Sequence, residues 1–335
     1  MKNTTRAIPV DLLRIFAASA IFYVHGGLAT GWPLAGWGDF AVATFIYLSS
    51  GCATRFSQPA AGGLRTYWLS RFRAIYPTFA IISVAIFAAS FIHAPNKTGS
   101  HYTVAELAAN LMMISAYIGK PWLTEPMWFV PFVLQVYLIL PLLMKIPARR
   151  YILPAAFLVS GMASAAVFAL NPGHPVHAHD ICRNWSPIFR LPEVMFGCLL
   201  GRAGSVADAI APVVIYAVCC ALTALLAIHQ SSPVSNTLTL PLHGLVVFLV
   251  LAAAVAAILP FIRDQQSAAI ALLGRAALPF FLLHGTGIGL MSERFGRNNL
   301  AWILYFVLCW AGSVIFVLAL DKVRRRAPRP GRCPS

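Results

Sequence analysis

The sequence has few charged residues, and very few of those are acidic. Only 10% of its residues are charged and 59% are hydrophobic, whereas about a quarter of the residues of an ordinary soluble domain are charged. A chain of this composition cannot cover a surface that faces water. It also lacks any polar segment long enough to fold by itself, because apolar stretches recur from residue 8 to residue 320. We therefore expect a single membrane domain over residues 1–321, followed by a basic cytoplasmic tail over 322–335.

The cysteines lack the spacing of metal or redox sites. The chain has seven cysteines but no CxxC pair, and four of them (Cys198, Cys219, Cys220 and Cys309) lie inside apolar runs. These four are predicted to be small buried residues.

The first apolar run, which begins near Pro9, lacks a clear small-residue cleavage site and carries ionisable residues. It is therefore predicted to remain as the first membrane span and not to be removed as a signal peptide.

The apolar runs have the length of transmembrane helices. A run of about twenty residues spans a bilayer, and a backbone in hydrocarbon must satisfy its own hydrogen bonds, so these runs are helices. The fold class is therefore an all-α membrane bundle. A shorter run at 103–118 is expected to form an outer-face or re-entrant helix, because its crossing would invert every later loop. Ten spans are predicted, near 8–28, 38–55, 74–93, 127–144, 151–170, 185–201, 208–228, 238–260, 270–292 and 300–320.

The basic residues predict the orientation. Seventeen of the 25 lysines and arginines fall on one side of the ten-span arrangement, five fall on the other side, and three lie inside spans. Cytoplasmic loops of membrane proteins carry such an excess of positive charge, so both termini are expected to face the cytoplasm. The clusters are short and lie between apolar runs, a pattern typical of membrane loops. A nucleic-acid partner is therefore not expected, despite a net charge of +15.

Three ionisable residues lie in the first span, where each is costly unless it is paired or solvated. Asp11 and Arg14 are three residues apart and can pair on one helix face. From Arg14 to His25 the helix turns about 1100°, so both side chains point the same way, roughly 16 Å apart along the axis. Two interpretations remain open. The three residues line a polar site, or Asp11 and Arg14 anchor the helix at the interface while His25 bonds a neighbouring helix.

A resemblance to a known family favours the first interpretation. The stretch from Arg6 to His25 reads R-x4-DLLR-x10-H, and arginine, ten residues and histidine are the hallmark of the membrane acyltransferase 3 family, which the chain resembles. Further segments resemble that family in the same order: FIYLSSG (45–51), YWLSRFRAIYP (67–77), MWFVPFVLQVYLILP (127–141), FRLPEVMFGCLLGR (189–202) and FFLLHG (280–285).

The sequence departs from the family pattern at two motifs. FIYLSSG carries an extra serine, and VPFVLQVY stands where the family commonly has the carboxylate-rich SVEEQFY. Gln135 and Tyr137 are retained in the second motif, but any role of the family's glutamates does not carry over.

The resemblance implies an O-acyltransferase of the bacterial inner membrane. Such an enzyme moves an acyl group, usually acetyl, from cytoplasmic coenzyme A to a hydroxyl of a cell-surface glycan or lipid-linked sugar. Arg65, Arg71 and Arg73 lie at the predicted cytoplasmic side, and arginine's planar fork suits the donor's phosphates. Any cytoplasmic loop tends to be basic, however, so a purely topological role for these arginines stays open on the sequence alone.

His25 is the candidate base. The acceptor hydroxyl must lose a proton as it attacks the thioester, and imidazole titrates near neutral pH. A covalent acyl-histidine relay is the alternative chemistry. Arg14 is assigned to the donor or to the charge that develops on the thioester oxygen, with Asp11 as its structural partner.

The remaining candidates come from the later motifs. Ser50 is a candidate for donor contact or simply for close helix packing. In the ninth span His284 is preferred to Arg275, since the nine-residue step between them places the two on opposite faces. Arg190 and Glu193 can form an internal pair or contribute to the site. Candidate substrate contacts are therefore Trp128, Gln135, Tyr137, Arg190, Glu193 and His284.

No metal is expected. The outer loop at 173–180 contains three histidines and an aspartate, but their spacing matches no standard site.

The competing function is a polytopic transporter or flippase for a glycan or lipid, since buried charges also mark transport pathways. The acceptor, the choice between acetyl and succinyl donors, and the oligomeric state are left open, and a homo-oligomer is compatible with every feature above.

Overall fold

The computed structural model describes residues 8–32, 40–56, 63–91, 101–118, 122–147, 151–184, 186–228, 230 and 232–326. These residues fold into helices, with no strand among them. Eight helices are long and apolar enough to cross a membrane, so the chain is an all-α, multi-pass membrane protein. They are α1 (Ile8–Thr30), α3 (Gly63–Ala89), α5 (Phe129–Leu143, with the preceding turn η3, Glu125–Trp128), α6 (Ile152–Leu170), α9 (Val206–Ala227), α10 (Ser232–Ile258), α11 (Asp264–Leu283) and α13 (Asn299–Arg326).

Two of the ten predicted spans form shorter helices. The run at 38–55 forms α2 (Ala41–Phe56), and the run at 185–201 forms α8 (Leu191–Arg202). At 1.5 Å per residue α8 is about 18 Å long, against a hydrocarbon thickness of about 30 Å. Pro192 lies at the start of α8, where a proline is tolerated because the first helical N–H has no intrahelical partner. These two helices pack against each other.

Glycine brings α2 and α8 into backbone contact. A Cβ atom on Gly51 would lie 2.9 Å from the carbonyl oxygen of Gly197, and one on Gly201 would lie 2.3 Å from that of Gly51. No other residue fits at either position without moving a helix. Small residues allow such close packing in membranes, where burial from lipid adds little to helix association.

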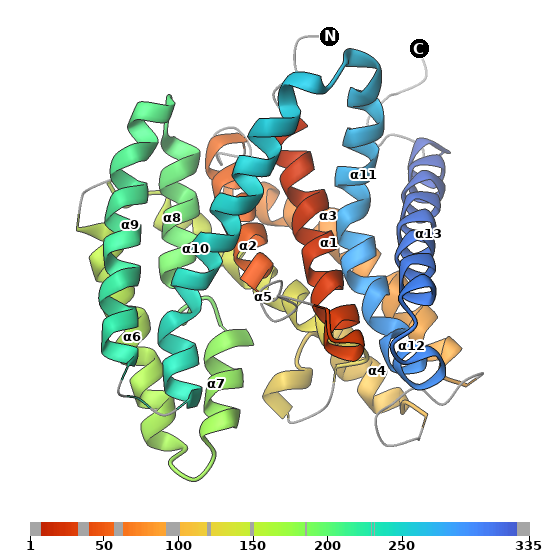
Figure 1. Cartoon of the computed structure of the whole chain (residues 1–335), viewed down its shortest axis with the longest axis horizontal. Coiled ribbons are helices and arrows are strands. Elements are labelled where there is room, and N and C mark those ends of the chain that lie inside the picture. The colour runs from red at the N-terminus through yellow and green to blue at the C-terminus, as the bar shows by residue number, and fades with distance from the viewer. Residues whose placement is uncertain are drawn as a thin grey trace.

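The sequence also misplaces some helix ends. The run predicted as one span at 270–292 is broken: α11 ends at Leu283, a short turn η5 follows (His284–Thr286), and α12 (Ile288–Phe295) is a separate helix. Gly285 lies in this break against Pro126, where a Cβ would come within 2.5 Å of the proline ring. The segment at 103–118 contains α4 (Val104–Leu111) and the turn η2 (Ser115–Ile118). The helix α7 (Pro175–Asn184) covers the same end of the bundle as α4 and α12 (Figure 1).

The helices are arranged around α1. Figure 1 shows α1 at the centre, α6 and α9 at one flank and α13 at the other, with α10 crossing in front. The main partner of α1 is α11, which in turn packs on α13. The start of α1 and the end of α13 lie at the same end of the bundle (Figure 1). Because α13 continues to Arg326, the first residues of the predicted tail extend this helix, and the rest of the tail lies outside the described residues.

Arginines join helix ends at that same end of the bundle. Arg202, in the last turn of α8, donates to the carbonyl oxygens of Leu143, Met144 and Ile146, at and just after the end of α5, at 2.8–3.3 Å. Arg55 at the end of α2 donates to the carbonyl oxygen of Ala203. The last carbonyl groups of a helix have no intrahelical donor, so these cations complete the helix ends.

Candidate active site

Two histidines that are far apart in the sequence meet in the structure. His25 lies near the end of α1 and His284 follows the last residue of α11, and their ring centroids are 5.2 Å apart with the planes 40° apart. The contact arises because α1 and α11 pack along their length and α11 ends where His284 reaches α1. No motif spacing could have predicted this pair.

His284 is fully buried and keeps one ring nitrogen without a hydrogen-bond partner among the described residues. Its Nδ1 lies 3.3 Å from the Phe280 carbonyl oxygen, while Nε2 has no partner. A proton on Nδ1, donated to that carbonyl, leaves Nε2 as an acceptor. Buried polar atoms in proteins are nearly always paired, so an unpaired one marks a place where a ligand group can bind.

A tyrosine of α13 holds the backbone at His284. The Tyr305 hydroxyl donates to the His284 carbonyl oxygen at 2.7 Å and accepts a hydrogen bond from the Gly287 N–H at 2.8 Å. It thereby satisfies backbone groups in the break between α11 and α12, as irregular backbone inside a membrane protein requires. Sequence reasoning missed Tyr305, and the available signal was a hydroxyl in the middle of an otherwise apolar run.

Asp11 and Arg14 form an ion pair at the other end of α1, as two residues three positions apart on one helix can. Arg14 donates to the Asp11 carboxylate at 3.1 Å, and the Arg14 side chain is 36% exposed whereas Asp11 is buried. Asp11 packs against Gly274 of α11, where a Cβ would lie 2.5 Å from the aspartate Cβ. Polar residues at both ends of α1 thus contact α11. Arg6, which opens the family motif, lies outside the described residues.

Arg71 is held by aromatic rings. Its guanidinium lies 5.5 Å from the ring centroid of Tyr67, one turn earlier on α3, and 5.4 Å from that of Tyr137 on α5. Its Nε is buried and has no hydrogen-bond partner among the described residues. Aromatic rings hold a guanidinium in place without cancelling its charge, so the N–H groups of Arg71 can still donate hydrogen bonds to an anion. The positive charges of Arg14 and Arg71 both act on the side chain of Cys52 on α2.

The other predicted donor contacts are placed differently. Arg65 and Arg73 are exposed on α3. Ser50 is fully buried where α2 meets α8, and its hydroxyl donates to the Ile46 carbonyl oxygen of its own helix at 2.7 Å. A Cβ on Gly197 of α8 would lie 2.0 Å from that hydroxyl. The position of Ser50 favours the packing role.

Two predicted substrate contacts lie towards the end of the bundle that carries α4. Gln135 on α5 donates from Nε2 to the Tyr117 hydroxyl at 2.9 Å. Trp128 packs edge-on against Phe129, whose ring in turn contacts Phe281, the second residue of the FFLLHG motif. Because Phe281 also contacts His284, a chain of rings links Trp128 to the histidine pair.

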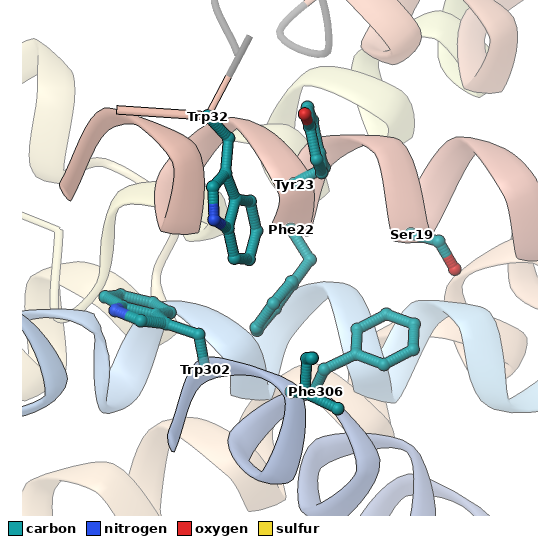
Figure 2. Close-up of a pocket in the computed structure, with 7 residues that line it drawn as sticks. Ser19, Phe22, Tyr23, Trp32, Trp302 and Phe306 are labelled. Atoms are coloured by element: carbon teal, nitrogen blue, oxygen red, sulfur yellow. The ribbon is translucent and has the colours of Figure 1, made fainter. Parts of the chain in front are cut away.

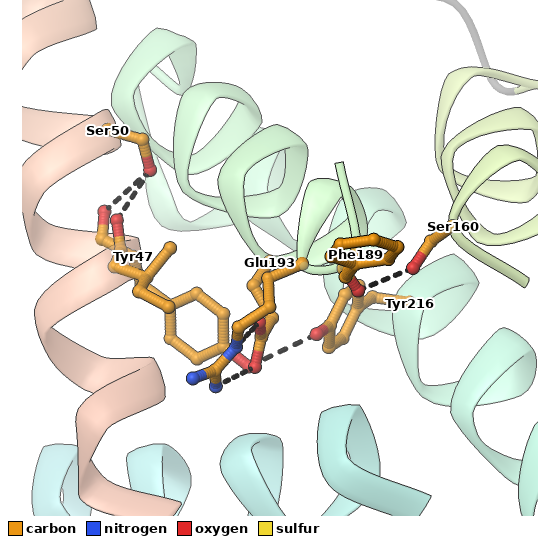
Figure 3. Close-up of polar contacts among 8 residues, drawn as sticks. Tyr47, Ser50, Ser160, Phe189, Glu193 and Tyr216 are labelled. Carbon is orange, nitrogen blue, oxygen red and sulfur yellow. Dashed lines mark hydrogen bonds and ion pairs between the residues drawn. The ribbon is translucent and has the colours of Figure 1, made fainter. Parts of the chain in front are cut away.

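A second buried polar cluster lies between α2, α8 and α9. Arg190 and Glu193 form a two-pronged ion pair: Arg190 Nε donates to one carboxylate oxygen, and Nη2 donates to the other at 2.6 Å. Both side chains are at most 2% exposed. The hydroxyls of Tyr47 and Tyr216 lie 3.2 Å apart beside this pair (Figure 3). Sequence reasoning missed both tyrosines.

The same cluster supports the irregular start of α8. The Ser160 hydroxyl on α6 donates to the Phe189 carbonyl oxygen at 2.5 Å (Figure 3). This bond satisfies a backbone group just before α8, where no helix supplies a partner. Arg190 and Glu193 thus pack beside Tyr47 and Tyr216 between α2, α8 and α9, whereas His25 and His284 meet between α1 and α11.

The side chains that remain do not gather into a metal site. No group of three or more histidine, cysteine, aspartate or glutamate side chains lies together within the described residues. The histidines of the 173–180 segment lie on or beside α7, and His179 Nδ1 lies 2.7 Å from the Thr237 hydroxyl of α10. Arg275 pairs with Asp321 of α13 at 2.7 Å, away from His284.

The family is shown by a comparison of the whole chain. No curated protein and no solved structure matches the chain. The model of a family described as an acyltransferase domain, acyltransferase 3, matches residues 9–322, from the first turn of α1 almost to the end of α13. The chain therefore belongs to the acyltransferase 3 family and is a multi-pass membrane acyltransferase.

Proposed function

We propose that this protein transfers an acyl group, most simply acetyl, from cytoplasmic acyl-coenzyme A to a hydroxyl of a cell-surface glycan or lipid-linked sugar. The observation that carries the proposal is the contact between His25 and the buried His284, whose Nε2 is unpaired within the described chain. An ester-forming enzyme needs a group that takes the acceptor proton, and imidazole is the side chain suited to do so near neutral pH.

The transfer step assigns a role to each histidine. His25 takes the proton of the acceptor hydroxyl as its oxygen attacks the thioester carbonyl carbon. A C–O bond forms, the C–S bond breaks, and the coenzyme leaves as a thiolate that takes up a proton. His284 Nε2, with Nδ1 protonated towards Phe280, accepts a hydrogen bond that orients the acceptor or the His25 ring. An acyl-histidine intermediate on His25 remains the alternative route.

Donor binding is proposed at the opposite end of α1. Arg14 is about 16 Å from His25 along the helix axis, and the positive charges of Arg14 and Arg71 both act on the Cys52 side chain. Phosphate groups are bound well by guanidinium forks, and Arg71 is preordered by Tyr67 and Tyr137. The thioester would then extend along α1 towards the histidines, while Arg65 and Arg73 add positive charge at the entrance.

The proposed orientation follows from this assignment. Both chain ends face the cytoplasm of a bacterial cell, in its inner membrane, and α7 and α12 face outwards. The short helices α2 and α8 complete ten membrane segments, and the segment that contains α8 is helical over only part of the bilayer thickness. The basic helix ends then lie on the cytoplasmic side, as the distribution of positive charge favours.

The test uses the purified protein in lipid vesicles with acetyl-coenzyme A labelled on its acetyl group. Wild-type protein should transfer label to surface glycan or lipid-linked sugar extracted from the host cell. His25→Ala should lower transfer by at least about 100-fold, the usual contribution of a general base. His177→Ala, on outer helix α7, is the matched control and should leave transfer unchanged.

The same experiment separates the proposal from a transporter or flippase. A transporter would move glycan or lipid across the vesicle membrane without binding the thioester or acylating anything. Transport without label transfer would refute the proposed function, and full transfer by His25→Ala would refute His25 as the base.

A further inference from the structure

An apolar cavity lies between α1 and α13, beside the histidine pair. It has a volume of about 460 Å³, within the range of ligand pockets. Figure 2 shows rings from the α1 side and from α13 facing one another across it. Most of its lining is aromatic (Phe22, Tyr23, Trp32, Trp302 and Phe306), and Ser19 and Ile303 complete it.

The polar groups of the two indole rings in this lining are already paired. Trp32 Nε1 donates to the Asn299 side-chain oxygen at 2.6 Å, and Trp302 Nε1 donates to the Gly296 carbonyl oxygen at 2.9 Å. The two indoles therefore present only carbon to the cavity. A polar ligand would lose its hydration there and find few groups besides the Ser19 and Tyr23 hydroxyls to replace it, whereas a hydrocarbon chain needs none.

The cavity opens sideways, towards lipid. Of the residues that line it, Tyr23 and Ile303 are 37% and 54% exposed, and both lie within candidate membrane spans. Along α13 the exposed face continues through Leu304, Val307 and Leu308. A chain that enters between Tyr23 and Ile303 therefore comes from the bilayer and not from water.

One wall of the cavity is shared with the proposed active site. The ring of Phe22 lines the cavity, and its centroid lies 6.2 Å from that of His284. His25 is on the next turn of α1. At the outer end, Trp32 stacks on Tyr23 with centroids 5.1 Å apart. Tryptophan and tyrosine favour the membrane–water interface, the depth at which a lipid's polar head lies.

We propose that this cavity binds the hydrocarbon chain of a lipid-linked acceptor. The chain lies between α1 and α13, which holds the attached sugar at the outer ends of these helices, next to His25 and His284. This inference rests on the proposed function and narrows its acceptor from glycans in general to a sugar carried on a membrane lipid. The acyl-coenzyme A donor is not expected to occupy this cavity, because its proposed phosphate ligands, Arg14 and Arg71, lie towards the other end of α1.

A photoreactive lipid tests the site directly. The probe is a polyprenyl phosphate sugar with a diazirine in its chain, mixed into vesicles that contain the full-length protein. After illumination, mass spectrometry should find labelled peptides from α1 around residues 19–23 and from α13 around 302–306. Ser19→Phe places a ring in the cavity and should lower labelling about tenfold, because it removes the burial of roughly two methylene groups.

Two matched variants separate the possible outcomes. Leu308→Phe adds the same bulk on the lipid-facing side of α13 but outside the cavity, and should label like the wild type. His25→Ala should also keep full labelling, since it alters transfer and not the cavity. If acyl transfer fails in every preparation while labelling persists, the proposed function is wrong and the lipid site stands.

A competition experiment identifies the source of the chain. Unlabelled polyprenyl phosphate sugar should remove the labelling, whereas the same amount of ordinary phospholipid should not. Equal competition by phospholipid would mean that the cavity holds bulk lipid, and that result overturns the proposal. Labelling that is unchanged in Ser19→Phe overturns it as well.

Discussion

The two buried polar clusters of this protein differ in whether their hydrogen bonds are complete. At Arg190 and Glu193 a cation and a carboxylate bond each other through two atoms each, and both are almost fully enclosed. At His25 and His284 two imidazoles meet, and a buried nitrogen of His284 has no partner within the described chain. A satisfied cluster holds a fold together, whereas an incomplete one can engage a substrate.

Breaking the ion pair should have the largest effect on stability. Glu193→Ala leaves the Arg190 charge buried without a counter-charge, which typically costs about 3–5 kcal/mol. Thermal unfolding of the detergent-solubilised protein should show a much lower midpoint. The double variant Arg190→Met with Glu193→Leu removes both charges and should recover most of the loss.

If that double variant unfolds as readily as Glu193→Ala, the pair contributes more than the mutual neutralisation of two charges. If it is stable but has lost all acyl transfer, Arg190 or Glu193 belongs to the active site and the contrast between the clusters fails.

Loosening the histidine cluster should affect activity more than stability. Tyr305→Phe removes a donor from the His284 carbonyl and an acceptor from the Gly287 N–H, so His284 loses part of its support. Hydrogen bonds inside membrane proteins contribute about 1 kcal/mol, so unfolding should change little. Misplacing the imidazole should lower kcat about tenfold while KM for the donor is unchanged.

Steady-state kinetics with acyl-coenzyme A would check this split. A parallel fall in stability and kcat would indicate that Tyr305 is purely structural, and an unchanged kcat would indicate that His284 does not need to be held in place. Tyr216→Phe, in the satisfied cluster, is the matched control and should leave kcat unchanged.

The smallest effect is expected at Ser50. Its hydroxyl bonds the carbonyl of Ile46 within α2, which is already part of the helical hydrogen-bond pattern. Ser50→Ala keeps the close contact with Gly197 and should change stability by less than about 1 kcal/mol. Donor KM should not change; an increase of tenfold would return Ser50 to the donor site.

Most of the helices could be predicted from the sequence, but the short lengths of α2 and α8 could not. Hydropathy records how apolar a run is and not how far its helix extends. The run around α8 is apolar enough to span, yet the helix begins only at Leu191 because a turn precedes it and Ser160 satisfies the Phe189 carbonyl. Such support comes from another helix and leaves no mark on the local sequence.

Candidate residues were easier to select than to group. A charged or titratable residue in an apolar run is conspicuous, and His25, His284, Arg190 and Glu193 all stand out in this way. Spacing predicts contacts within one helix, such as Arg14 with Asp11. It does not predict that His284 meets His25 or that Tyr137 supports Arg71, since these contacts join different helices.

The sequence by itself determined that this is an all-helical membrane protein of the acyltransferase 3 type, because composition, run length and ordered motifs are properties of the linear chain. Tertiary structure alone decided which polar groups are satisfied and which are left open. The physical reason is that a buried group's partners come from whichever helices pack around it, and glycine contacts such as Gly274 with Asp11 set how closely those helices approach.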